Sequence, residues 1–143
     1  MTLQLQIIGK VANIAKEGRL VEIARGADEV KRFRELIKSH IGIINGELDH
    51  ELMPGEVGGN HYHKKKKEVI VYTVGEGLRV DLTDPATGKI FSTLPKIGSI
   101  FYLPPEIGHA LVNTSKSNIR FREYSGLAFD PKNPKNDVHN IKP

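Results

Sequence analysis

The chain of 143 residues carries 38% hydrophobic and 27% charged residues and a formal net charge of +4, a composition that suits one globular domain and mildly favours phosphate-bearing partners. It contains no cysteine, which excludes disulfides, thiolate metal sites and cysteine nucleophiles, so a metal ion would need His, Asp or Glu ligands. No apolar stretch is long enough to span a membrane and Met1–Lys10 lacks the features of a secretory signal, so we expect a cytoplasmic protein without a membrane partner.

The N-terminal extension, residues 1–37, is predicted to form a strand followed by a helix. Leu3–Ile8 is the strand candidate. Apolar residues then recur at helical spacing behind Asp28, a plausible N-cap; they are Val30, Phe33, Leu36 and Ile37. We expect a short amphipathic helix that covers one face of the fold.

Short β-favouring segments fill residues 38–126, where glycine, proline and asparagine recur as breaks. The predicted strands are Glu47–Met53, Val69–Val74, Leu78–Leu82, Lys89–Thr93, Ile100–Leu103 and Ile119–Tyr124. Turn-forming residues in Asp84–Gly88 predict that the strands on either side form a hairpin. The spacing predicts an all-β sandwich or barrel in a single domain, residues 1–143, whose polar tail 127–143 runs over the surface or onto a partner.

Histidines and carboxylates are concentrated in the segment Gly55–Gly75. Residues two apart on a β-strand point to the same face, so His61 and His63 would present a chelating pair of imidazoles. The run Lys64–Lys67 follows, which we interpret as a solvated turn and not as a nucleic-acid site, because no aromatic residues interleave with it. Such a bend would bring the Glu68 carboxylate to the same point.

A second segment, Gly98–Asn113, contains a third histidine. Together the two segments resemble the two signature motifs of the cupin superfamily, G-x5-H-x-H-x4-E-x6-G and G-x5-P-x-G-x2-H-x3-N. The first motif is matched at every fixed position; in the second, Glu106 stands where the pattern has glycine, so the turn before His109 must be built differently, with Gly108 as a candidate. By this resemblance, a cupin jelly-roll barrel (a double-stranded β-helix) would hold one divalent ion, Zn, Fe, Mn or Ni. The four ligands that the resemblance implies are His61, His63, Glu68 and His109.

Other interpretations of these residues stay open. His61 and His63 could be ordinary surface histidines on a polar strand, although four ligand-type residues in two matching motifs favour the metal site. Asn60 and Asn113 are candidates for residues that orient the metal ligands without binding the ion themselves. The remaining histidines have no motif support and are interpreted as solvated: His40, His50 and His139.

Three further stretches resemble the C-terminal metal-binding cupin domain of the bifunctional UDP-linked deoxy-hexulose reductase/epimerases of capsular polysaccharide synthesis: Gly18–Ile23, Gly59–His63 and Phe129–Pro134. In that family the cupin domain epimerises the sugar nucleotide at a carbon beside a keto group. This chain resembles a stand-alone equivalent without the nucleotide-dependent reductase domain, so we expect no reduction step. Short metal-dependent sugar-phosphate isomerases of archaeal type are also similar, through the barrel and the His-x-His site.

The resemblance implies a metal-dependent isomerase or epimerase acting on a keto or aldo sugar that carries a phosphate or a nucleotide, with the ion polarising the carbonyl. The base that removes the neighbouring proton stays open among Glu68, His50, Glu51 and Glu123. On the last predicted strand, alternation alone does not decide which residues point inward. The first candidates for holding the substrate there are Arg120, Arg122 and Tyr124. A cupin dioxygenase with a redox metal and a non-enzymatic sugar-binding cupin are the alternatives.

The expected quaternary state is a homodimer. A single barrel of this size leaves sheet edges unpaired, and the strand Leu3–Ile8 needs a partner. Exchange of this strand between two copies is one route to such a dimer.

Overall fold

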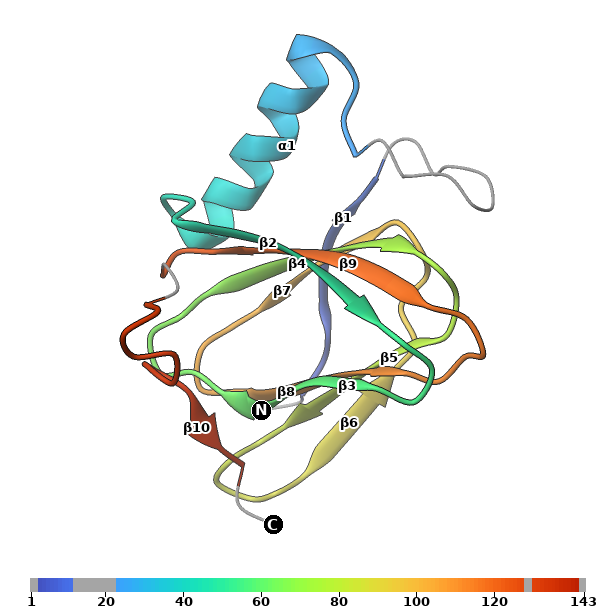
Figure 1. The fold of residues 1–143 in the computed structure, drawn as a ribbon. Helices are drawn as coiled ribbons and strands as arrows, with labels where there is room; N and C mark the ends of the chain where they lie inside the picture. Colours follow the sequence, from blue (N-terminus) through green and yellow to red (C-terminus); the bar gives the residue numbers. More distant parts are fainter. Residues whose placement is uncertain (1–2, 12–22, 128–129, 142–143) are drawn as a thin grey trace.

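The computed structural model of the chain describes residues 3–11, 23–127 and 130–141 (Figure 1). Within these ranges it contains one helix, α1 (Gly26–Ile41), and ten strands. The strands are β1 (Gln6–Lys10), β2 (Gly46–Leu52), β3 (Val57–Tyr62), β4 (Glu68–Val74), β5 (Leu78–Thr83), β6 (Ile90–Thr93), β7 (Ser99–Leu103), β8 (Gly108–Asn113), β9 (Ile119–Ser125) and β10 (His139–Asn140). No helix among the described residues combines the length and the apolar character that a membrane crossing needs.

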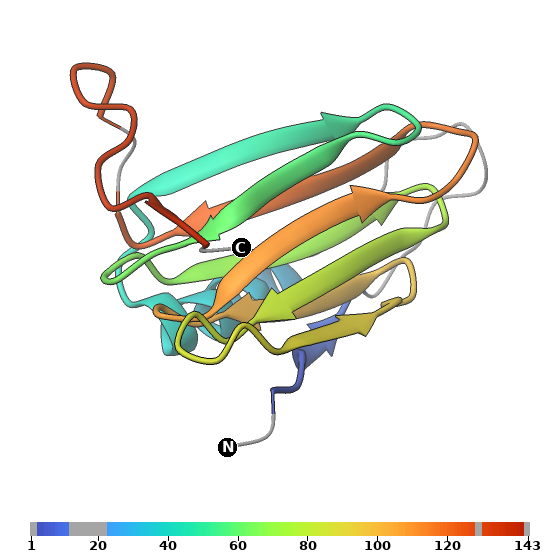
Figure 2. The ribbon, with the colours of Figure 1, turned by 90° about the horizontal axis from the view of Figure 1, so that it is seen from below.

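The strands form two antiparallel sheets. The first sheet has the order β1-β7-β4-β9-β2, and the second has the order β10-β3-β8-β5-β6. Figures 1 and 2 show the two sheets facing each other, with α1 on the outer face of the first sheet. This arrangement confirms the predicted all-β jelly-roll architecture with a short N-terminal helix.

Apolar side chains fill the space between the sheets and the space under α1. The interior core contains Tyr72 and Phe101 of the first sheet and Leu78 of the second, each at most 1% exposed. A separate cluster between the first sheet and α1 contains Ile37 and Val69. Full burial of one such side chain stabilises the fold by roughly 1.5–3 kcal/mol. The central strand β4 of the first sheet is therefore buried on both faces, which fixes its register firmly.

The N-cap of α1 differs from the prediction. The helix begins at Gly26 with Arg25 at the N-cap position, so the assignment of Asp28 as the N-cap is wrong. The Arg25 backbone N–H donates to Glu29 Oε2 at 2.6 Å. Asp28 and Glu29 both lie in the first turn, where negative charge interacts favourably with the helix dipole. Three of the four predicted apolar positions pack against the first sheet, namely Phe33, Leu36 and Ile37.

Pairing with neighbouring strands sets the strand ends. β5 and β6 pair antiparallel, which confirms the predicted hairpin. β1 begins later than the predicted strand Leu3–Ile8, because its pairing with β7 starts at Gln6 opposite Tyr102. β2 ends one residue earlier than predicted, because its last pair with β9 joins Leu52 to Ile119.

The register of β9 decides which of its residues face the interior. Phe121 belongs to the interior core, whereas Tyr124 belongs to the cluster under α1. Alternation along the strand then places Glu123 inside, with Arg120 and Arg122 on the face that carries α1. The two cores on either side of β9 thus show which of its residues face the interior, which alternation alone does not decide.

The C-terminal tail returns to the second sheet. β10 pairs antiparallel with β3, with His139 opposite Tyr62, and the two rings stack at a centroid distance of 5.1 Å. The tail therefore lies against the end of β3. Two stretches used for the resemblance begin outside the described residues, Gly18–Ile23 and Phe129–Pro134.

Candidate metal centre

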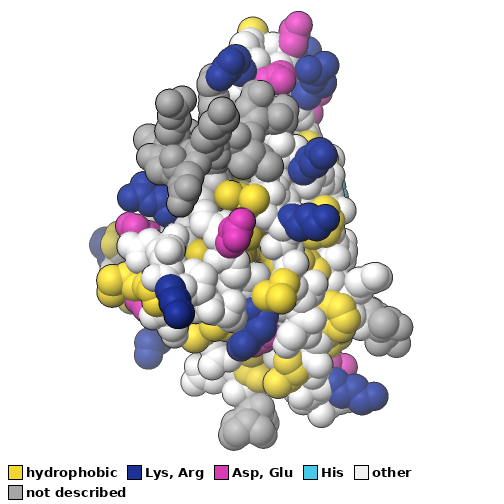
Figure 3. Space-filling view, turned by 90° about the vertical axis from the view of Figure 1, so that its right-hand side faces the viewer, with side chains coloured by type: hydrophobic (Ala, Val, Ile, Leu, Met, Phe, Trp, Pro, Cys, Tyr) yellow, Lys and Arg dark blue, Asp and Glu magenta, His cyan; other side chains and the backbone are white. Residues whose placement is uncertain are grey.

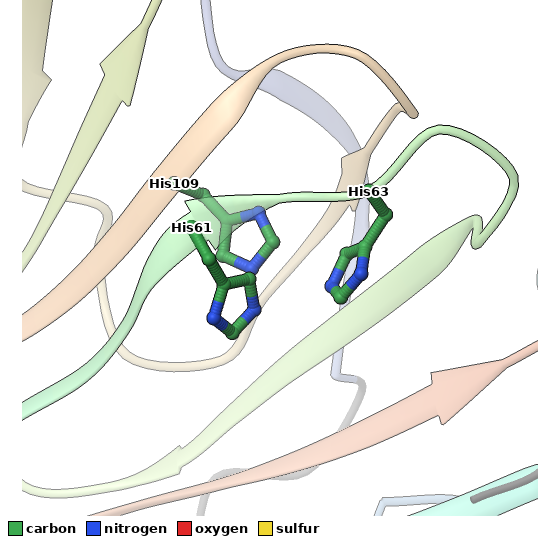
Figure 4. A group of neighbouring side chains, drawn as sticks. All are labelled: His61, His63 and His109. Carbon is green, nitrogen blue, oxygen red and sulfur yellow. The ribbon is translucent and has the colours of Figure 1, made fainter. Parts of the chain in front are cut away.

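Three histidines converge in the interior at one end of the jelly roll. His61 of β3 lies directly opposite His109 of β8 in the sheet register, and His63 follows just after β3. One ligand atom from each ring lies within 4.8 Å of the other two, and Figure 4 shows the rings directed into a common space. His63 and His109 are each only 4% exposed. The structure thus brings together the three histidines that the two motifs singled out.

A bulge in β3 directs His61 toward His109. The register between β3 and β8 shifts between Gly59 and His61, and Asn60 adopts a φ of 70° at that point. Asparagine is one of the few non-glycine residues that tolerate this left-handed conformation. Asn60 therefore acts through the backbone, by setting the direction of the strand that carries His61.

The turn before His109 is also left-handed. Glu106 adopts a φ of 69°, the conformation that glycine adopts most readily, and its N–H donates to the His63 carbonyl at 2.5 Å. The expectation that Gly108 builds this turn is wrong, because Gly108 already lies in β8. The Glu106 hydrogen bond ties the two ligand-bearing segments together.

The Glu68 carboxylate adjoins the histidines at the start of β4. Its Oε1 lies 2.7 Å from His63 Nε2 and 3.8 Å from His109 Nε2. His63 Nδ1 lies 2.7 Å from the Asp137 carbonyl, which can only accept, so Nδ1 is the donor and Nε2 of the neutral ring carries a lone pair. Two acceptors then face each other, and neither buried atom has a hydrogen-bond partner. A cation between them would stabilise this arrangement, so the residues present fit a metal ion.

The protonation states of the cluster also suit a metal ion. Burial and the two neighbouring rings lower the pKa of His61 to about 4, and burial lowers the pKa of His109. Burial alone would raise the pKa of Glu68, but a hydrogen bond from His63, formed when Nε2 of that ring also carries a proton, and the neighbouring Glu123 and Lys66 groups lower the pKa overall. Neutral imidazoles and an ionised carboxylate are the forms that bind divalent ions.

The spacing of the ligand atoms is close to what an ion requires. Metal–nitrogen bonds of about 2.0–2.1 Å keep ligand atoms within about 4.2 Å of one another. The three histidine ligand atoms lie within 4.8 Å of one another, which is close to this limit. A set of imidazoles with one carboxylate suits zinc, iron, manganese or nickel.

A second polar group, which we call the acid–base cluster, lies beside the histidines and consists of His50, Lys66 and Glu123. Lys66 Nζ lies 3.5 Å from Glu123 Oε2 and 4.0 Å from Glu68 Oε1. His50 stacks on Phe121 at a centroid distance of 4.8 Å, and its buried Nε2 lies 3.9 Å from Glu123 Oε1 without a hydrogen-bond partner. The three side chains are 32%, 21% and 16% exposed, so solvent reaches the cluster.

The electrostatics of this cluster favour proton transfer. Burial and the neighbouring Glu68 carboxylate raise the pKa of Glu123 to about 8, against the opposing effect of the Lys66 ammonium. Burial lowers the pKa of His50 and favours its neutral form. A carboxyl group that titrates near neutral pH beside a neutral imidazole can both take up and release a proton.

Several proteins of known structure share the fold of this chain, although their sequences differ strongly from it. No model of a known protein family matches the sequence, and no curated protein is a detectable relative. CapF, a capsular polysaccharide assembling protein from Staphylococcus aureus, matches with a TM-score of 0.61 and 16% identity over 99% of this chain and 34% of CapF. QdtA, a sugar 3,4-ketoisomerase from Thermoanaerobacterium thermosaccharolyticum, matches with a TM-score of 0.60 and 19% identity over 96% of this chain and 88% of QdtA. A dTDP sugar isomerase from Desulfovibrio desulfuricans matches with a TM-score of 0.63 and 14% identity over 99% of this chain and 88% of that protein. The chain has the cupin fold. It spans about a third of the length of CapF.

Several predicted site residues lie outside the interior of the jelly roll. Glu51 is 45% exposed and pairs with Arg120 at 3.5 Å. The Arg122 Nε donates to Asp49 Oδ1 at 2.8 Å on the same outer face, and the Tyr124 ring makes an edge-on contact with α1. The structure does not bring Glu51, Arg120, Arg122 or Tyr124 together with the histidines, because they alternate with inward-facing neighbours.

Asn113 lies at the end of the cupin jelly roll away from the histidines. Its Nδ2 donates to the carbonyls of Leu52 and Ser117 at 2.9 and 2.8 Å, which joins two turns at that end. The expectation that Asn113 supports the metal ligands is therefore wrong. Figure 3 shows this end of the molecule, where hydrophobic side chains lie among lysine and arginine side chains.

Lys66 differs from the other members of the run Lys64–Lys67. The expectation of a solvated turn holds for Lys64, Lys65 and Lys67, which are exposed, and is wrong for Lys66. Lys66 instead directs its ammonium group toward Glu68 and Glu123. A signal was present, because Lys66 precedes Glu68 by two residues and residues two apart in extended chain share a face.

Proposed function

We propose that this cupin is a metal-dependent isomerase or epimerase acting on a keto or aldo sugar that carries a phosphate or a nucleotide. The observation that carries the proposal is that the histidine cluster and the acid–base cluster lie side by side, with Lys66 Nζ 4.0 Å from Glu68 Oε1 and 3.5 Å from Glu123 Oε2. Proton transfer next to a polarised carbonyl needs these two kinds of group side by side. The shared fold with a sugar ketoisomerase and a dTDP sugar isomerase supports this substrate class.

The four residues that would hold the ion are His61, His63, His109 and Glu68. When bound, a divalent ion supplies stabilisation for the negative charge that develops on a substrate carbonyl oxygen. Glu68 is buried and its pKa is lowered, so it serves as a ligand rather than as the proton acceptor.

Glu123 is the base in this proposal. Its Oε2 faces Lys66 and its Oε1 faces His50, so both carboxylate oxygens have a neighbour that orients them. Glu123 takes the proton from the carbon next to the carbonyl, and the Lys66 ammonium holds the carboxylate in place. The neutral His50 ring lies 3.9 Å from the same carboxylate, so it can accept the proton that Glu123 has taken up and, as the imidazolium, return it to the substrate in the second half of the reaction.

The charge around the site suits an anionic substrate. Lys64, Lys65 and Lys67 are exposed on the turn that follows the ligand His63. Their ammonium groups raise the local concentration of phosphate-bearing molecules near the histidine cluster. These lysines replace Arg120 and Arg122 as the cations we propose for the phosphate.

Proton exchange in deuterated water tests the proposed reaction. We expect the zinc-loaded protein to exchange the carbon-bound proton beside the carbonyl of TDP-4-keto-6-deoxyglucose, a ligand seen bound to QdtA, with or without oxygen. Redox-inert zinc suffices because polarising a carbonyl requires no change of oxidation state. Oxygen consumption that appears only with iron, manganese or copper would replace the proposal with a cupin dioxygenase. Sugar-nucleotide binding without exchange would replace it with a binding cupin.

We also propose that the chain forms a homodimer in solution. β1 and β6 are edge strands of the two sheets, and apolar side chains between them line a cavity of about 370 Å³. Ile7, Phe91 and Leu94 in this region are 54%, 38% and 65% exposed. A second copy of the chain would pair the β1 edge and cover this apolar surface.

Light scattering measures the predicted dimer directly. We expect twice the 15.9 kDa chain mass at micromolar concentration, and a monomer for Leu94→Glu, because a buried charge opposes the interface. The control is Ile43→Glu, since Ile43 is 76% exposed and does not line this cavity. A wild-type monomer mass would refute the dimer.

A further inference from the structure

The Asp137 carboxylate occupies the inside of the turn formed by Lys64, Lys65 and Lys66. Its Oδ1 accepts the Lys64 N–H at 3.0 Å, and its Oδ2 accepts the N–H groups of Lys65 and Lys66 at 2.9 and 2.8 Å. The side chain is only 5% exposed. Successive backbone N–H groups that converge on one anion form a strong binding site, and here a residue 71 to 73 positions later in the chain fills it.

The backbone of the same residue contacts a metal-ligand candidate. The Asp137 carbonyl accepts a hydrogen bond from His63 Nδ1 at 2.7 Å. Asp137 adopts a φ of 59°, which directs its carboxylate to the turn and its carbonyl to the ring. A hydrogen bond to the second ring nitrogen of a ligand histidine fixes both the tautomer and the ring orientation.

The rest of the tail packs on both ligand-bearing segments. The His139 ring stacks on Tyr62, which lies between the ligands His61 and His63 in sequence. Ile141 packs on Gly108, the residue before His109, so closely that a Cβ on Gly108 would lie 2.6 Å from Ile141 Cδ1. The tail therefore contacts the chain on either side of the histidine cluster.

We propose that Asp137 is a positioning residue that orients His63 for metal binding, so that docking of the C-terminal tail sets the metal affinity of the site. The carboxylate holds the tail on the turn, and the carbonyl then selects the His63 tautomer whose Nε2 faces Glu68. This inference rests on the proposed metal centre. The tail thereby becomes part of the site, although Asp137 touches neither the ion nor the substrate.

Zinc titration of tail variants tests the positioning role. We expect Asp137→Ala to weaken zinc binding by about 10- to 100-fold, the usual effect of losing an interaction that orients a metal ligand. Asp137→Asn retains one acceptor oxygen without the charge, and it is expected to fall between the wild type and Asp137→Ala. The matched control is Asp130→Ala, because among the described residues the Asp130 carboxylate in the same tail accepts a hydrogen bond only from the Lys132 N–H, at 2.9 Å.

Nitrogen NMR of the His63 ring supplies a readout that needs no metal. In the metal-free wild type we expect the Nδ1–H tautomer, and in Asp137→Ala a mixture of tautomers. Zinc binding that is equally tight in the wild type and Asp137→Ala would overturn the positioning role and leave the metal centre intact. A wild type that binds no zinc would overturn the metal centre, and the tautomer comparison would then decide the role of Asp137 alone.

Discussion

Replacing Glu123 with glutamine is expected to lower the rate of proton exchange beside the substrate carbonyl by about 100-fold or more, the usual contribution of a general base. Glutamine keeps the size of the side chain and can still face Lys66 and His50, but it cannot accept a proton. The rate is measured by NMR in deuterated water with the zinc-loaded protein.

The pH dependence of this rate identifies the base independently. The pKa of Glu123 is raised from the usual 4.5 to about 8, and a base acts only when deprotonated, so the rate is expected to rise with pH across this range. A nearby divalent ion favours the ionised carboxylate and moves the midpoint below 8. The Glu123→Gln variant is expected to lose this rise.

A matched carboxylate on the neighbouring strand provides the control. Glu51 of β2 lies on the outer face, where it pairs with Arg120, so Glu51→Gln is expected to leave the exchange rate unchanged. A full rate in Glu123→Gln, or an equal loss in Glu51→Gln, would remove Glu123 from the mechanism.

Removing a buried ligand is expected to have the second large effect. His109 is 4% exposed and lies opposite His61 in the sheet register, so no other described side chain is placed to take over its ligand atom. We expect His109→Ala to weaken zinc affinity by about 100-fold or more. Loss of a hydrogen-bond partner of a metal ligand already costs about 10- to 100-fold, and loss of the ligand itself should cost at least as much. Calorimetric titration measures the affinity, and circular dichroism with thermal unfolding shows that the variant is folded.

His40→Ala is the control for this substitution. His40 lies near the end of α1, where its Nδ1 contacts the Leu36 carbonyl at 3.0 Å, and it is remote in the fold from the histidine cluster. Its replacement is expected to leave zinc affinity unchanged. An unchanged affinity in His109→Ala would contradict the assignment of this histidine as a ligand.

The sequence predicted the strands and the pair His61 and His63 because both depend on short-range spacing, whereas His109 was implied by the resemblance to the cupin motifs. Alternation places His61 and His63 on one face, and turn residues mark the hairpin of β5 and β6. The direction of the β9 side chains depends instead on the two different cores against which the first sheet packs. Only tertiary packing therefore shows that Arg120 and Arg122 lie on the outer face.

Long-range contacts explain the other differences. Lys66 points inward from a turn whose shape depends on Asp137, a residue 71 positions away. Glu106 forms a left-handed turn that the motif assigns to glycine, and its N–H is held by the His63 carbonyl. The hydrogen bond from Lys66 to Asp137 and the one from Glu106 to His63 each join residues far apart in the chain, so local patterns do not encode these two contacts.

The metal content of the purified protein tests the central claim most directly. We expect elemental analysis after mild dialysis to find about one divalent ion per chain, because the three histidines and Glu68 provide a complete ligand set. The claim would be contradicted by a protein that holds no stoichiometric metal and gains no thermal stability when zinc, manganese, iron or nickel is added.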